Sequence, residues 1–208
     1  MANVAGYFGF MQWGTASGPP NFAQSHNTPY RIAGGSSGYY STAIYRGDLC
    51  KMNASATGYV EQWANGDGGT ATRIPVGIFD GCEYYSVSQG KGIWSPYWPG
   101  TSDASGDVNA YIIDDPNALF KVQAGISVAI TQTSIGQTAD IVATPVGSTV
   151  TYQSGMSLST PTTTNTNPFK VVNVITTPPG ANGTDLTTPN NYVVVAFNNQ
   201  QYKQLLGV

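Results

Sequence analysis

Residues 73–88 read RIPVGIFDGCEYYSVS, a run of β-branched and aromatic residues interrupted by proline and glycine. Such a composition is typical of strands bounded by turns. The run follows two apolar segments, STAIYRGDLCKM at 41–52 and GYVEQW at 58–63, and the glycine-rich turn NGDGGT at 65–70. Residues 41–88 are therefore predicted to form one antiparallel meander.

The same pattern continues to the end of the chain, where almost no segment has a helical period. The further predicted strand segments are DVNAYIIDDP, LFKVQA, ISVAITQTSIGQTADIVAT, FKVVNVITT and NYVVVAF. The first two are separated by Asp115-Pro116-Asn117, a favourable turn. The predicted fold is all-β, as an antiparallel sandwich, a barrel or a jelly-roll-like domain, and 208 residues suffice for one large domain or two small ones.

The first 40 residues differ from the rest of the chain. They are rich in glycine, serine and proline, yet they contain aromatic residues that disordered segments rarely carry. We interpret residues 1–40 as an extended arm that lies on a surface, either that of its own domain or that of a neighbour. Residues 41–208 form the β-rich domain. A subdivision near residues 126–165 stays open, because the Thr-rich segment LSTPTTTNTNP resembles an exposed loop or hinge.

Charge is scarce in this chain. Eight basic and eleven acidic residues give a net charge of −3, and the basic residues are scattered, so no stripe is present that would neutralise nucleic-acid phosphates. The opening MANVAGYFGFMQWGT has no lysine, arginine or sustained apolar run, which argues against a signal peptide or a membrane anchor. In a reducing compartment, Cys50 and Cys82 are expected to be buried thiols and not a disulfide.

Residues with catalytic or metal-binding potential are few. His26 is the only histidine and is expected on the surface. Asp114 and Asp115 are adjacent, so in a strand they would point to opposite faces and could not act as a facing acid and base. Asp103, Ser105 and Asp107 have the alternate spacing of the ligands in a calcium-binding loop, but the glycine and the distant glutamate of such a loop are missing. No catalytic, cofactor or metal site is predicted, and the chain is not expected to be an enzyme.

The segment GIWSPYWPG at 92–100 carries the densest aromatic surface. Pro96 and Pro99 exclude a central strand, so the segment is predicted to be an edge or a loop near the surface. Core packing is an equal alternative for at least one of the tryptophans. Trp94, Tyr97 and Trp98 cannot all be core residues, and rings at a surface favour a protein interface or a platform for sugars.

These residues belong to a longer run, VGIFDGCEYYSVSQGKGIWSPYWPG at 76–100, which is continued by DVNAYIIDDPNALFKVQ at 107–123. Together with the opening MANVAGYFGFMQW and the segment FKVVNVI, it resembles a family of small head proteins of tailed bacteriophages, the capsid decoration or cement proteins encoded near the major capsid protein. The resemblance covers residues 1–125 and is weaker in the last third. It rests on sequence character and not on a catalytic signature.

The resemblance implies a non-enzymatic, β-rich virion protein that is made in the host cytoplasm and binds the outside of the assembled capsid. The implied partners are the major capsid protein and further copies of the same chain. A dimer and a trimer would both obey closed symmetry, and of the two we favour a trimer. We expect the interface to involve Tyr7, Phe8, Phe10, Trp13, Trp94, Tyr97 and Trp98. The alternatives are a minor tail or appendage protein and a glycan-binding module, because tryptophans on a β scaffold also stack on sugar rings.

Overall fold

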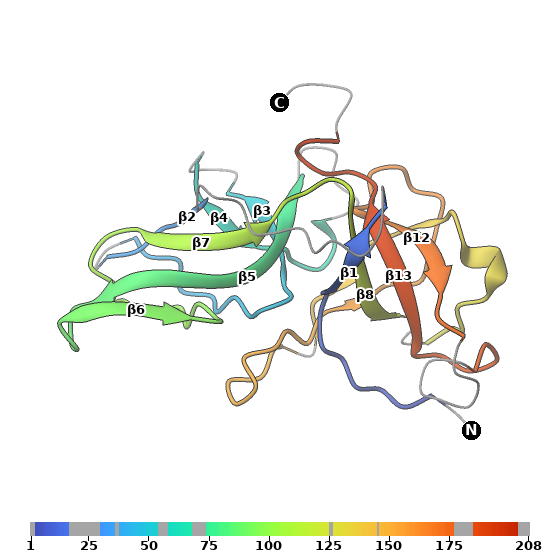
Figure 1. Cartoon of the computed structure of the whole chain (residues 1–208), viewed down its shortest axis with the longest axis horizontal. Helices are drawn as coiled ribbons and strands as arrows, with labels where there is room; N and C mark the ends of the chain where they lie inside the picture. The colour runs from blue at the N-terminus through green and yellow to red at the C-terminus, as the bar shows by residue number, and fades with distance from the viewer. Residues whose placement is uncertain are drawn as a thin grey trace.

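The computed structural model describes residues 3–16, 30–35, 38–53, 58–67, 74–124, 127–144, 146–176 and 185–203. Within these ranges the protein is all-β, as expected from the sequence, with mainly antiparallel sheets and no α-helix. Two lobes lie side by side, one built on a six-stranded sheet and the other on a seven-stranded sheet (Figure 1).

The six-stranded sheet contains β2 (Tyr30–Ile32), β3 (Leu49–Met52), β4 (Val60–Gln62), β5 (Pro75–Ser86), β6 (Lys91–Ser95) and β7 (Val108–Ile113). Its order is β2-β7-β5-β3-β4, and β6 pairs with the distal half of β5. The predicted meander is wrong in its connections, because β3 lies between β4 and β5 and both strands pair with it. A parallel bridge between Arg31 and Tyr59 brings the two ends of the sheet together, so the sheet is strongly curled.

The seven-stranded sheet contains β1 (Met11–Thr15), β8 (Ala118–Ala124), β9 (Thr138–Ala139), β10 (Ile141–Val142), β11 (Ser157–Leu158), β12 (Phe169–Val174) and β13 (Asn191–Phe197). A short 3-10 turn, η2 (Gln132–Ser134), precedes β9. The order is β10-β11-β8-β13-β12-β9, with β1 added to β8. Its two end strands, β9 and β10, are separated only by Asp140, so the sheet closes into a nearly complete barrel.

Side-chain alternation explains how this barrel fills its interior. In β12, Phe169 and Val171 are buried while Lys170 between them is exposed. In β13, Val193 and Val195 belong to the core, and Val194 between them is buried on the opposite face, where it pairs with Lys121. Residues two apart on a strand share a face, so each strand contributes one row to the core. A register shift after Val171 bends β12 at the point where the alternation breaks.

The described part of the N-terminal arm lies on its own domain. Residues 3–16 run extended, and β1 pairs with β8 in the seven-stranded sheet. Phe10, just before β1, is buried, and its ring stacks on Phe169 with 4.4 Å between the ring centroids. Residues 17–29, which include His26, lie outside the described residues.

The lobes share one of the two apolar cores, and the other lies within the first lobe. Leu49, Trp63, Ile78 and Ile113 belong to the first lobe but pack with the interior of the seven-stranded sheet. Trp63 is completely buried, and its indole Nε1–H donates to Asp140 Oδ1 at 3.1 Å. Asp140 lies between β9 and β10, the two end strands that meet where the barrel closes, and we call this place the seam of the barrel. Trp63 therefore joins the first lobe to the second at the seam.

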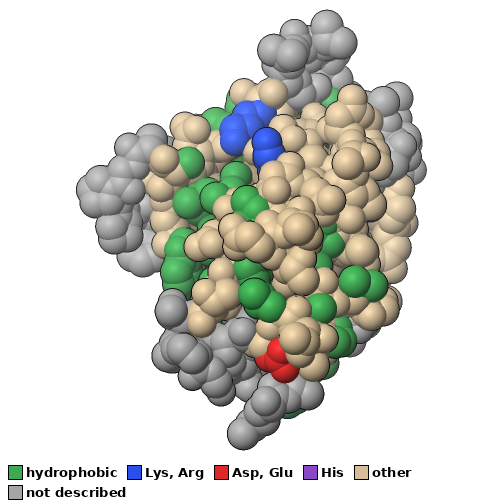
Figure 2. Space-filling view, turned by 90° about the vertical axis from the view of Figure 1, so that its right-hand side faces the viewer, with side chains coloured by type: hydrophobic (Ala, Val, Ile, Leu, Met, Phe, Trp, Pro, Cys, Tyr) green, Lys and Arg blue, Asp and Glu red, His purple; other side chains and the backbone are tan. Residues whose placement is uncertain are grey.

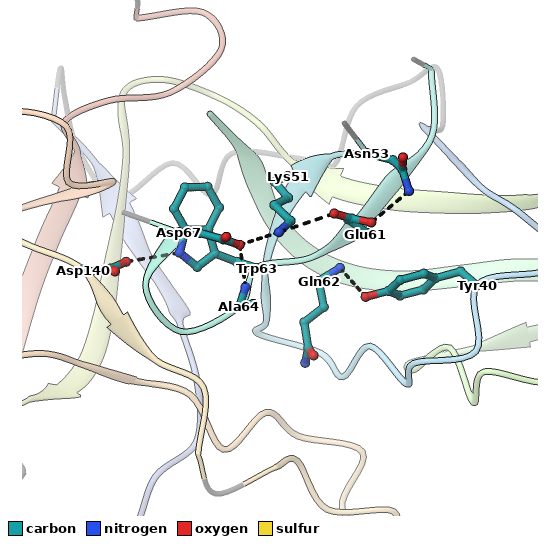
Figure 3. A network of polar contacts seen from close by, with 9 residues as sticks. All are labelled: Tyr40, Lys51, Asn53, Glu61, Gln62, Trp63, Ala64, Asp67 and Asp140. Atoms are coloured by element: carbon teal, nitrogen blue, oxygen red, sulfur yellow. Dashed lines mark hydrogen bonds and ion pairs between the residues drawn. The ribbon is translucent and has the colours of Figure 1, made fainter. Parts of the chain in front are cut away.

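A buried ion cluster lies beside this tryptophan (Figure 3). Lys51 on β3 is buried and makes ion pairs with Asp67 and, at 3.3 Å, with Glu61 Oε1. Asp67 also accepts a hydrogen bond from the backbone N–H of Ala64 at 2.8 Å, and Glu61 accepts one from Asn53 Nδ2 at 2.9 Å. These contacts hold the loop after β4, which carries Trp63, in a fixed shape.

Both cysteines are buried thiols, as expected. Burial raises the pKa of the Cys82 thiol to about 12 and that of the Cys50 thiol well above its ordinary value. A neutral buried thiol behaves as a small apolar side chain, so both cysteines serve packing in the core of the first lobe.

Replacement of Lys51 tests the importance of the buried cluster. In Lys51→Met the side-chain volume is retained but two carboxylates lose their cation, so the free energy of unfolding should fall by about 3–5 kcal/mol. The matched control is Arg46→Met. Arg46 Nε pairs with Asp80 Oδ1 at 2.8 Å, but its side chain is 60% exposed, and the loss should be about 0–1 kcal/mol. Urea denaturation followed by circular dichroism measures both, and equal losses would contradict the assigned role of the cluster.

Candidate functional site

Two exposed aromatic surfaces lie on opposite lobes. The first is the Lys121 patch, which we define as Phe8, Trp13, Lys121 and Tyr192 on the outer face of the seven-stranded sheet. Lys121 Nζ lies 5.9 Å from the ring centroids of Phe8 and Trp13 and 4.7 Å from that of Tyr192. Phe8 and Tyr192 also contact each other, with 5.7 Å between their centroids. A cation among three ring faces is an attractive arrangement that orders all four side chains.

A β-bulge explains how Trp13 reaches this patch. Gln12 pairs with Phe120 and Gly14 pairs with Leu119, so Trp13 is the extra residue of β1. A bulge re-aims the side chain that it carries, and here it leaves Trp13 49% exposed beside Lys121. The neighbouring Met11 is equally exposed, which extends the apolar surface along β1.

Polar contacts hold the start of the chain against the same sheet. Gln123 on β8 accepts a hydrogen bond from the Gly6 backbone N–H at 2.8 Å and donates one to the Val4 carbonyl oxygen at 2.8 Å. The Tyr7 hydroxyl donates to Asn190 Oδ1 at 3.1 Å. Tyr7 and Phe10 therefore anchor the arm, while Trp13 is exposed and Phe8 is half-buried beside Lys121.

The aromatic rings of segment 92–100 lie in different environments, since Trp98 is buried and Trp94 is exposed. Trp98 is fully buried, and its Nε1–H donates to the Tyr40 carbonyl oxygen at 2.8 Å. Its backbone pairs with Ile44, which directs the ring into the core of the first lobe. Trp98 can therefore brace a contact surface from beneath but cannot form one. Trp94 on the edge strand β6 is 61% exposed.

Tyr97 lies in a stack of three tyrosines that joins the lobes. Its ring centroid is 5.7 Å from that of Tyr45 and 4.7 Å from that of Tyr152, with nearly parallel planes. Tyr152 belongs to the second lobe and has a φ of 59°, an uncommon value for a bulky residue. The Arg46 backbone N–H donates to the Tyr152 carbonyl oxygen at 3.1 Å, which holds the loop in this conformation.

A buried carboxylate supports this stack. Asp48 Oδ2 accepts hydrogen bonds from the Tyr45 backbone N–H at 2.8 Å and from Gln62 Nε2 at 2.6 Å. Burial raises the pKa of Asp48 to about 6, because desolvation outweighs the opposing effects of the Ser154 hydroxyl and of these two donors. Asp48 is thus a titratable group at the junction between the lobes.

The second exposed surface crosses the outer face of the six-stranded sheet. Arg31 pairs with Asn109, Asn109 with Glu83, and Glu83 with Trp94, so one residue from each of β2, β7, β5 and β6 forms a continuous row. Directly paired residues of antiparallel strands share a face. We call these four residues the Trp94 row. It lies in the lobe opposite to that of the Lys121 patch (Figure 1).

The surroundings of this row keep its side chains in place. A Cβ atom added to Gly81 would lie 3.1 Å from Trp94 Cζ2, so the absence of a side chain at Gly81 lets the indole lie down on the sheet. The Tyr111 hydroxyl donates to Glu83 Oε2 at 3.0 Å. Tyr85, two residues beyond Glu83 on β5, is 51% exposed and shares the face.

The acidic residues considered in the sequence have structural partners. Asp103 accepts hydrogen bonds from Ser86, from the Ser88 N–H and from the Ser88 hydroxyl, and these bonds lower its pKa. Asp114 Oδ2 accepts a hydrogen bond from the Tyr30 hydroxyl at 2.8 Å. Within the described ranges, no group of three or more histidine, cysteine, aspartate or glutamate side chains is placed to hold a metal ion.

No helix in the described part of the chain has the length and apolar character needed to cross a membrane. No protein-family model matches the chain, and neither the curated proteins nor the solved structures give a significant match.

Several members of the two surfaces were not predicted. Glu83 and Tyr85 alternate along β5, as Asn109 and Tyr111 do along β7, which indicates one exposed face on each strand. Their proximity to Trp94 depends on strand register, which the sequence does not reveal. Phe8 and Trp13 were predicted as surface residues, but their contacts with Lys121 and Tyr192 were not. Lys121 and Tyr192 lie on strands far away in the sequence, and the sequence does not reveal which strands become neighbours.

The raised pKa of Asp48 predicts a pH-dependent stability. The folded state retains a proton at Asp48 between about pH 4 and pH 6 that the unfolded chain releases, so this stabilisation is full below pH 4 and is lost as the pH rises through 6. Asp48→Asn cannot ionise. Its free energy of unfolding, relative to that of the parent protein, should therefore rise by up to about 3 kcal/mol between pH 4 and pH 7.5. Urea titrations at both pH values measure the change, and a pH-independent difference would contradict it.

Proposed function

We propose that this protein is a structural component of a tailed-bacteriophage head that binds the outside of the assembled capsid and stabilises the contacts between coat subunits. A protein that binds only the assembled shell stabilises it by mass action over many copies, without any reaction. The resemblance at residues 76–100 and 107–123 supports this proposal, and the Lys121 patch is the observation that carries it.

The Lys121 patch has the composition of an interface centre. Aromatic residues and methionine are enriched at the core of protein interfaces, and here Phe8, Trp13 and Tyr192 lie beside the exposed Met11. The rings are ordered before binding, because each faces the ammonium group of Lys121. Preorganised rings lose little conformational entropy on association.

The lobe that carries the Lys121 patch has few charged side chains at its end of the molecule (Figure 2). Viewed from the end formed by the seven-stranded sheet, the molecule shows hydrophobic side chains gathered over part of the face and few charged ones (Figure 2). A stable interface needs about 800 Å² from each partner. The arm enlarges the available area because its residues 3–16 lie along the surface of this sheet.

The copy number in purified particles tests the proposal. Quantitative mass spectrometry should find this chain in a ratio to the major capsid protein near one, or in a simple fraction set by shell symmetry. A dozen copies or fewer would favour the alternative of a tail or appendage protein. Absence from the particles would refute a virion role.

Substitution of Trp13 tests the proposed contact. Because Trp13 is half exposed and lies at a bulge, Trp13→Ala should cost about 1 kcal/mol of stability or less but should lower capsid occupancy at least about tenfold, as expected for an interface aromatic. Trp94→Ala is the matched control. The sequence placed Trp94 among the expected interface residues, but its exposed indole lies on the other lobe, outside the contact proposed for the Lys121 patch. Co-sedimentation with capsids that lack the protein measures occupancy, and equal binding by both variants and the parent would exclude the Lys121 patch.

A further inference from the structure

We propose that the Trp94 row is a binding site for a neutral oligosaccharide of hexopyranose units. This inference is independent of the capsid role, because it concerns the opposite lobe. It starts from Trp94, an indole that lies over Gly81 and is 61% exposed. A flat aromatic face turned to solvent is the group on which the C–H face of a pyranose ring stacks, since that sugar face is apolar and the ring face carries partial negative charge.

Polar groups flank this indole in the positions that sugar hydroxyls require. Glu83 is the direct cross-strand partner of Trp94, and Asn109 is the next residue in the row. The Glu83 carboxylate presents acceptors and the Asn109 amide group presents donors, while Asn109 Oδ1 already accepts a hydrogen bond from Arg31 Nη1. The Tyr111 hydroxyl already donates to Glu83, which fixes the carboxylate before a ligand arrives.

The row also has length and open space. Arg31 and Trp94 lie three strand spacings apart, roughly 14 Å at about 4.8 Å for each spacing, which suits a short oligosaccharide. Gly92 faces Tyr85 across the β5–β6 pair, and a Cβ atom at Gly92 would meet nothing within 4 Å. The surface between the two exposed rings is therefore free of a covering side chain.

The exposed apolar area of Trp94 and of the neighbouring Tyr85 suits a ligand the size of a short oligosaccharide. An aromatic side chain buries about 150–250 Å² when it is fully covered, so two rings that are each a little more than half exposed offer roughly 150–300 Å². Glu83, next to the indole, disfavours anionic sugars at the stacking position. Arg31 at the other end of the row carries the opposite charge to Glu83, so the row has no net charge and suits a small, neutral ligand.

Binding is measured with the full-length protein in two steps. An array of neutral and acidic glycans identifies a neutral ligand, which is then titrated while tryptophan fluorescence is recorded. Trp63 and Trp98 are buried, so a spectral change reports on Trp13 or Trp94. We expect saturable binding with a dissociation constant of about 1 mM or below, since the surface is open and shallow.

Variants then assign the binding to the row. Trp94→Ala should weaken the affinity about tenfold or more, and Glu83→Gln, which preserves shape, should weaken it less. Trp13→Ala, which removes the other exposed indole, should bind sugar like the parent. Thermal melting curves confirm that each variant is folded. The proposal would be overturned if the array were blank, if only acidic glycans bound, or if Trp94→Ala kept the affinity of the parent. It would also be overturned if Trp94→Ala changed only the oligomer size measured by light scattering, because Trp94 would then belong to a contact between copies of the chain.

Discussion

The hydrogen-bonded insertion of Trp63 into the seam of the seven-stranded barrel is the constraint on which the arrangement of the lobes depends. The indole leaves the first lobe, enters the core of the second and donates to Asp140, the residue between the two end strands of the barrel. A buried tryptophan N–H requires an acceptor, and here the acceptor belongs to the residue at which the barrel closes. Docking of the lobes and closure of the barrel are consequently one event.

The surroundings of Trp63 make that event specific as well as favourable. Burial of an indole is non-directional in its energy, but the ion pairs of Lys51 with Asp67 and Glu61 fix the loop that presents it. The tyrosine stack adds a second connection on another side of the junction, where Tyr97 of one lobe contacts Tyr152 of the other. With two separate connections the lobes cannot rotate about either of them. The exposed surfaces at the two ends of the molecule therefore keep a fixed relation.

The sequence predicts composition-dependent features well and register-dependent features poorly. The all-β class, the turn at Asp115 and the buried cysteines follow from local residue preferences, and the structure agrees with them. The sequence does not predict that Trp94 is exposed and Trp98 is buried, although the two residues are only four positions apart. In a straight strand they would share a face, but Pro96 lies between them, and Trp98 then pairs with Ile44 and turns inward. The surfaces that gather Lys121 or Glu83 with aromatic rings join strands far apart in sequence, and hydrophobic alternation alone does not specify which strands become neighbours.

The pairing of β1 with β8 has a consequence for synthesis. Met11 pairs with Lys121, which follows it by 110 residues, and β8 pairs in turn with β13 near the end of the described chain. At about 5–20 residues per second, the first strand waits roughly 5–20 s for its partner after it is translated. During that delay Phe8, Phe10 and Trp13 have no core or sheet to cover them. The nascent chain therefore exposes an aromatic segment while it is still on the ribosome. Chaperones can bind this segment, and on overproduction it is the first part of the chain that would aggregate.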